Sequence, residues 1–136
     1  MRRLLLTTAA LIFATAAAAT AAEVDMSTVL LDGSGKPMQD CAQWVTKNNQ
    51  PDCDQLVDLT LGLLAYGSLN KAVPNEGAAD QTKRGNLALK VYHAGKVTLD
   101  HDESELIRAA IAKQGYPPVT VARALAVLDG TPPPKK

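Results

Sequence analysis

Cys41 and Cys53 are the residues most clearly able to take part in covalent chemistry, because they are the two cysteines of the 136-residue chain. Their spacing, C-x11-C, matches neither the C-x-x-C of redox sites nor a zinc-ligand pattern. A pair this close in sequence predicts a structural disulfide in an oxidising compartment, where closing the loop is worth about 3 kcal/mol. We expect a polar loop over 43–54 that this disulfide holds closed, with pairing within one chain or between two chains left open.

The two histidines, His93 and His101, give a weaker indication of a metal site. His101 and Glu105 are four residues apart on an expected helix, and Asp102 lies between them. A metal site needs three or four converging ligands with a supporting shell, and a solvated polar face explains the same residues. No serine lies in a nucleophile-elbow pattern either. We therefore expect no catalytic residue, no metal and no cofactor, and we treat the chain as a non-enzyme.

The stretch Gly33-Ser34-Gly35-Lys36 raises the question of a phosphate-binding loop. The G-x-x-x-x-G-K-[ST] pattern would require glycine where Leu30 stands and a hydroxyl residue where Pro37 stands. The stretch is instead typical of a turn, which joins extended segments at 28–31 and 36–38 into a short N-terminal hairpin.

The first 22 residues have the pattern of an export signal. Arg2 and Arg3 precede a small-residue apolar stretch, and Ala-rich residues up to Ala22 offer a cleavage site. The stretch is too diluted by threonine and alanine to favour a membrane anchor. We expect cleavage after Ala22 and a periplasmic or secreted protein with no stable membrane span.

Removal of residues 1–22 leaves 12 basic and 14 acidic residues, a net charge of −2. The charges are interspersed and aromatic residues are few, so no basic face for nucleic acid is expected. Residues 23–130 suffice for one small domain, and the Pro/Lys residues 131–136 are expected to form a disordered tail.

Four helices are predicted from apolar spacing and capping residues. They cover 61–70 after an N-cap at Thr60, 80–94, a segment opened by Asp100 and Glu103 that runs to 114, and 118–128. Residues 97–99 are expected to be extended, and 23–27 to be loose. The glycines in the first helix, Gly62 and Gly67, either let another backbone approach closely or mark a helix that depends on tertiary packing, and we favour the second explanation. The fold class predicted is mainly α, with about four helices, a small N-terminal β-hairpin and one disulfide-closed loop.

Several segments together resemble a loosely defined family of small bacteriophage and prophage proteins of uncharacterised function. They are "VLLDGSGKPMQDC", "LTLGLLAYGSLN", "TKRGNLALKVYHAGKVTLDHDESELIRAAIAK" and "YPPVTVARALAVLD". The resemblance covers most of the chain after residue 22, implies a hairpin plus helices, and carries no catalytic residue. The export signal and the cysteine-flanked insert depart from the family pattern and point to a role in the periplasm.

Three functional hypotheses follow. The first is a prophage-derived binding or modulating protein that contacts another protein, such as one of the cell envelope. Trp44 in the loop 42–52 is then the candidate anchor, although packing of Trp44 under the loop explains the sequence equally. The second is a homo-oligomerising, phage-particle-associated protein that uses 119–128. The third is a metal-dependent enzyme that uses His93, His101 and Glu105.

Overall fold

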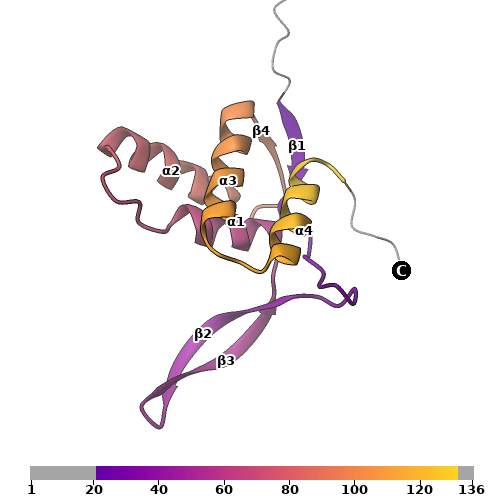
Figure 1. Cartoon of the computed structure of the whole chain (residues 1–136), viewed down its shortest axis with the longest axis vertical. Helices are drawn as coiled ribbons and strands as arrows, with labels where there is room; N and C mark the ends of the chain where they lie inside the picture. Colours follow the sequence, from indigo (N-terminus) through magenta and orange to yellow (C-terminus); the bar gives the residue numbers. More distant parts are fainter. Residues whose placement is uncertain (1–20, 132–136) are drawn as a thin grey trace, which may run out of the picture.

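The computed structural model describes residues 21–131, and over this range the chain forms four helices and four strands (Figure 1). The helices are α1 (Leu61–Leu69), α2 (Ala78–Val91), α3 (His101–Lys113) and α4 (Pro118–Leu128). The strands are β1 (Ala22–Asp25), β2 (Gln39–Lys47), β3 (Gln50–Asp58) and β4 (Lys96–Leu99). They form two separate two-stranded antiparallel sheets, β1 with β4 and β2 with β3.

This architecture is mixed α/β, so the prediction of a mainly α fold with one small N-terminal hairpin is wrong. Only one bridge, Leu31 to Pro37, joins the two halves of the hairpin expected over 28–38, and Val29 bridges Thr60 instead. The longest strands lie in the expected polar loop over 43–54. Strands are usually recognised from alternating apolar and polar residues, because one face of the strand is buried in the core. This hairpin buries neither face in the core, so its sequence lacks that alternation.

The small sheet of β1 and β4 joins two distant parts of the chain. Val24 pairs with Val97, and Val24 and Leu99 are both buried. The extended segment predicted at 97–99 is therefore confirmed as a strand. The segment 23–27, which was expected to be loose, is instead tied down by this pairing and by the buried Met26, whose N–H donates to the carbonyl of Gly95.

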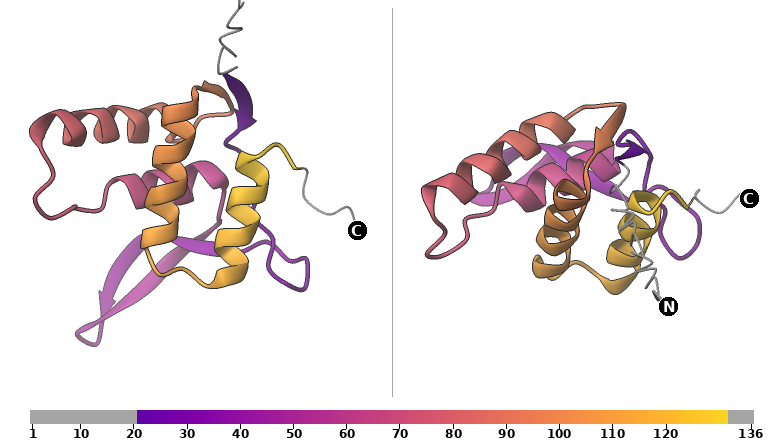
Figure 2. Two further views of the ribbon diagram at one scale, coloured as in Figure 1. Left: turned by 45° about the horizontal axis from the view of Figure 1, so that its top comes forward. Right: turned by 90° about the horizontal axis from the view of Figure 1, so that it is seen from above.

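Helix α1 is the centre of the core. The helices α3 and α4 lie side by side against it, and α2 packs on another of its sides (Figure 2). Because α1 is covered on several sides, it is apolar around most of its circumference. The buried apolar residues are Val24, Met26, Leu30, Leu59, Leu61, Leu64, Ala65, Leu69, Leu87, Ala88, Val91, Leu99, Ile107, Ile111, Ala124 and Leu128.

Gly62 is required by a close approach of backbone to α1. A Cβ at this position would lie 2.8 Å from the carbonyl oxygen of Val91 and 3.1 Å from that of Met26. The Gly62 N–H donates to the same Met26 carbonyl at 2.9 Å. The preferred explanation, a helix that depends on tertiary packing, is therefore wrong for Gly62, because another backbone does approach closely and a larger residue would clash with it.

The predicted helix starts follow local capping chemistry. The Thr60 hydroxyl accepts the N–H of Leu63, and Asp100 and Glu103 form a reciprocal capping box at the start of α3. The end of α2 differs from the prediction: the helix stops at Val91, and His93 adopts a positive φ of 50°. Gly95 therefore does not end that helix.

Arg84 closes the loop between α1 and α2. It is 9% exposed, and its Nη1 donates to the carbonyls of Leu69, at 2.7 Å, and Lys71. Its Nη2 donates to Glu76 Oε2 at 2.7 Å. These bonds satisfy carbonyls that the end of α1 would otherwise leave unpaired.

The predicted signal peptide 1–22 and tail 131–136 lie almost wholly outside the described residues. Cleavage after Ala22 would remove the first residue of β1. No helix among residues 21–131 has the length and apolar character needed to cross a bilayer.

Candidate functional site

The strands β2 and β3 form a long hairpin, the arm, which comprises Gln39–Asp58 and extends away from the four helices (Figure 1). None of the buried core residues belongs to it. Its two-residue turn is Asn48-Asn49, with φ values of 53° and 62°. Two positive φ values are typical of the type I′ turn, whose twist matches that of an antiparallel hairpin.

Cys41 and Cys53 form a disulfide within the chain, with their Cα atoms 5.7 Å apart. The predicted disulfide is thus present, but the segment it encloses is a hairpin of two paired strands and not an irregular polar loop. Irregularities at Ala42 and Asp54 bring the two cysteines together, since Cys41 is paired with Leu56 and Cys53 with Trp44. The bond therefore joins the two strands diagonally across the middle of the arm, from the Cys41–Leu56 pair to the Trp44–Cys53 pair.

The strand register places Trp44 and Leu56 on the same face as the disulfide. Directly paired residues of an antiparallel ladder share a face. Trp44 is paired with Cys53, Leu56 with Cys41, and the disulfide joins the two pairs. We call these four residues the Trp44 face. Its two large side chains are open to solvent, Trp44 at 65% and Leu56 at 60% exposure.

The charged residues near the tip belong to the opposite face. The Lys47 ammonium lies 2.9 Å from an Asp52 carboxylate oxygen and 3.9 Å from one of Asp54. Val45, which is paired with Asp52, also lies on this side and is half-buried. The arm is consequently amphipathic, although no residue of either face belongs to the buried core.

The arm accounts for the net negative charge of residues 23–136. It contains four aspartates and one lysine, a net charge of −3, whereas residues 23–136 together carry −2. The remainder of that range is therefore slightly basic. A partner that contacts the arm would gain from lysine or arginine near its binding surface.

Both edges of the arm are poorly suited to pairing with a further strand. The irregularities at Ala42 and Asp54 interrupt the regular spacing of backbone N–H and carbonyl groups, one on each strand. Pro51 lacks an N–H altogether. Bulges and proline are devices that oppose edge-to-edge pairing. The side chains of the Trp44 face are thus the accessible recognition feature of the arm.

The structure answers the question that the sequence left open about Trp44. Its indole is not folded under a loop, because the segment is a strand and the side chain is two-thirds exposed. A role as partner contact stays a prediction. Leu56, which was not singled out from the sequence, shares the same face. The pair Asn48-Asn49 between two cysteine-containing segments is typical of a hairpin turn. Recognising that turn would have predicted two paired strands and so placed Leu56 opposite Cys41.

The residues considered for a metal site do not converge. His93 follows α2 and contacts Tyr92 with its ring tilted by 52° and the ring centroids 4.1 Å apart, and Tyr92 stacks on Tyr66 at 4.2 Å. His101 and Glu105 lie on the first turns of α3 and line a separate hollow. No group of three or more potential ligands occurs among residues 21–131.

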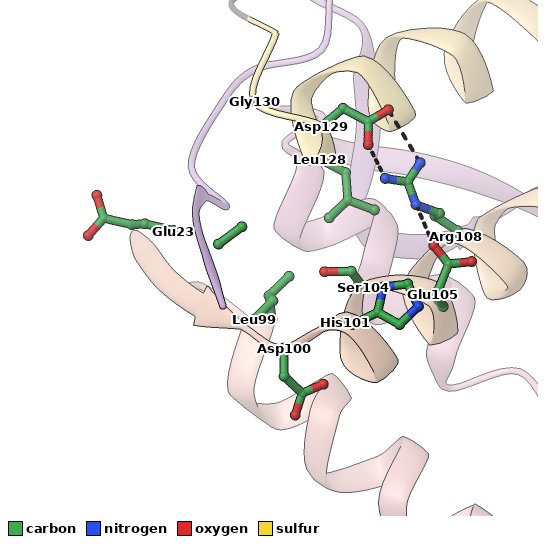
Figure 3. A pocket seen from close by; sticks show the side chains of 11 residues that line it. Glu23, Leu99, Asp100, His101, Ser104, Glu105, Arg108, Leu128, Asp129 and Gly130 are labelled. Atoms are coloured by element: carbon green, nitrogen blue, oxygen red, sulfur yellow. Dashed lines mark hydrogen bonds and ion pairs between the residues drawn. The ribbon is translucent and has the colours of Figure 1, made fainter. Parts of the chain in front are cut away.

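That hollow, about 440 Å³, lies between α3 and the ends of β1 and α4 (Figure 3). Its cation, Arg108, is already occupied, since it binds the Asp129 carboxylate and lies 3.1 Å from Glu105. The hydrogen bond from Arg108 holds the pKa of Asp129 below its ordinary value, and the same bond raises the pKa of Arg108. Ser104 also lines the hollow, but no hydrogen bond joins it to His101 in the described part of the chain. The arrangement is that of a surface ion-pair network.

Comparison with known proteins yields no match to a family model, a curated protein or a solved structure. The resemblance to small phage and prophage proteins accordingly stays a prediction.

Proposed function

We propose that this chain is a small exported, non-enzymatic binding protein that recognises another protein through the Trp44 face of the arm. The observation that carries the proposal is the exposure of Trp44 and Leu56 on one face of a disulfide-fastened hairpin. Tryptophan is among the residue types that most often dominate binding energy at interfaces. Fastening the arm also lowers the conformational entropy lost on binding.

The charge of the arm specifies the chemistry of the partner. A surface that carries −3 favours encounter with a basic surface. The Trp44 face itself contains no charged residue. The partner proposed is therefore a protein with an apolar cleft bordered by lysine or arginine.

The export part of the proposal is supported by residues 1–22 and by the disulfide. Disulfides persist in oxidising compartments and are rare in the bacterial cytoplasm. An envelope protein is accordingly the expected partner.

The alternative of self-association through 119–128 has less support. In α4 the apolar residues Ala124 and Leu128 are buried and Leu125 is partly buried, all packed on the core of the same chain. Val119, at 40% exposure, is the large apolar residue that α4 leaves open among the described residues.

The test is photo-crosslinking in a Gram-negative host that expresses the full chain. A photoreactive phenylalanine analogue replaces Trp44, and in a matched control it replaces Leu89, which is 71% exposed on α2. We expect position 44 to label one envelope protein that position 89 does not label. That protein, once purified, should bind the wild-type chain at least about tenfold more tightly than Trp44→Ala/Leu56→Ala, with Leu89→Ala unchanged. Equal labelling at both positions, or equal affinity of all three chains, would contradict the proposal.

A further inference from the structure

The Trp44 face is too small to form a standard protein interface alone. Nine-residue strands extend about 30 Å, and two strands side by side span about 10 Å, so one whole side of the arm, of which the Trp44 face is a part, has a footprint of about 300 Å². A stable, specific complex buries about 800 Å² on each partner. A partner held by this face must therefore contact the protein elsewhere, and the nearest surface is the base of the arm.

A groove of about 440 Å³, the basal groove, adjoins the base of the arm. It lies between α1 and the start of α4 and continues onto the first residues of the arm, Gln39 and Asp40. Its apolar lining includes Leu59, Leu63 and Tyr116. The groove is thus continuous with the element that presents Trp44.

Gly67 lines this groove from the last turn of α1, and the packing of the fold does not account for it. A Cβ at Gly67 would have the Tyr116 hydroxyl, at 4.0 Å, as its nearest neighbour, whereas at Gly62 it would meet backbone at 2.8 Å. Glycine inside a helix lowers helix stability relative to alanine. The position therefore tolerates a side chain sterically, and what glycine provides there is open space in the groove.

We propose that the basal groove receives a bulky apolar side chain of the same partner that binds the Trp44 face. This inference rests on the proposed function. The groove lining itself carries one acid and one base, Asp40 and Lys71. The inserted residue is flanked in the partner by lysine or arginine because the adjoining arm carries a net charge of −3. The two surfaces together form one continuous interface, in which Trp44 projects into the partner and the partner projects into the groove.

The test selects peptides from a display library of random linear sequences on the full-length, oxidised chain. Enriched peptides are synthesised and titrated against the wild type, Gly67→Leu, Trp44→Ala/Leu56→Ala and the matched control Gly85→Leu. Gly85 lies in α2, and a Cβ added there would have no neighbouring atom within 4 Å. We expect peptides with a bulky apolar residue beside lysine or arginine. Gly67→Leu should weaken their binding about tenfold by filling the groove, and Gly85→Leu should leave it unchanged.

Gly67→Ala separates loss of the groove from loss of folding. It should raise the melting temperature through helix propensity while weakening peptide binding, and a purely structural role would not produce this opposition. Suppose that the peptides bind Trp44→Ala/Leu56→Ala more weakly but bind both Gly67 variants as well as the wild type. This result would refute binding in the basal groove and leave the proposed function standing. Peptides indifferent to all variants, or no enrichment, would overturn both. A change of oligomeric mass in Gly67→Leu by light scattering would identify a second copy as the occupant and would also overturn the inference.

Discussion

Removal of the disulfide should unfold the arm and leave the helical body intact. No residue of Gln39–Asp58 belongs to the buried core. The flanking residues, in contrast, are fixed in the body: the Met38 N–H donates to the carbonyl of Leu30 at 2.8 Å, and the Leu59 N–H to that of Met38 at 2.7 Å. The arm is therefore a separate cooperative unit joined to the body at its base. The double substitution Cys41→Ala/Cys53→Ala tests this separation.

The magnitude follows from the closed loop. The two cysteines are 12 positions apart, and a bond at that separation is worth about 3 kcal/mol on the chain-entropy model. A two-stranded hairpin without such a bond is marginally stable. Losing about 3 kcal/mol corresponds to about a hundredfold increase in the opening equilibrium of the arm. The free energy of unfolding of the body should change little.

The assay is amide hydrogen exchange followed by mass spectrometry of proteolytic fragments. In the double variant, and in reduced wild type, amides of β2 and β3 should exchange about a hundredfold faster, while those of α1 and α3 keep their protection. Comparing reduced with oxidised wild type controls for the change of side chain, because the reduced chain keeps both sulfurs. Unchanged exchange in the arm, or simultaneous loss of protection in α1, would refute the reasoning.

Three further tests, one of them with Gly85→Ala as its control, probe interactions outside the arm. Gly62→Ala should lower the free energy of unfolding by about 1–3 kcal/mol, because its Cβ would meet the Val91 carbonyl. Gly85→Ala, the control, should raise that free energy by about 0.5–1 kcal/mol. Both are measured by denaturant unfolding, and equal effects would contradict the close approach. Arg84→Ala should lower the free energy of unfolding by about 3 kcal/mol, since it leaves the Glu76 carboxylate, 12% exposed, without its partner. A decrease below about 1 kcal/mol would show that the ion pair contributes little to stability. The pKa of Asp32 is lowered by hydrogen bonds from the Ser34 hydroxyl and the Lys36 N–H, so its stabilising effect on the turn is present at neutral pH and is lost as the pH falls through that lowered pKa. Ser34→Ala should raise this pKa in a carboxyl-carbon NMR titration, and an unchanged midpoint would contradict that cause.

Locally determined features were predictable from the sequence. The capping box of Asp100 and Glu103 involves groups three residues apart, and Thr60 caps α1 over the same distance. The disulfide was predictable because the chain has two cysteines in a short segment behind an export-like leader. In each case the interacting groups lie within 12 positions of each other in the chain, so the local sequence contains both partners.

The arm was missed because its sequence carries no core face. Strands are recognised from alternating apolar residues that a buried face requires, and Gln39–Asp58 buries none. Its composition, with Asn48-Asn49 and Pro51, therefore resembled a loop. The exposure of Trp44 was equally undecided, since a tryptophan in a polar segment is either covered by neighbours or free, and only the placement of those neighbours distinguishes the two.

The sequence by itself determined the starts of α1 and α3 and the disulfide pair, because these depend on residues close together in the chain. The tertiary structure decided that β1 pairs with β4, that Gly62 accommodates the backbone of Val91, and that Trp44 and Leu56 share one exposed face. These features depend on contacts between residues far apart in the chain or on the register of two strands. Neither is encoded in the spacing of any single segment, because a one-residue change of register moves a side chain to the opposite face.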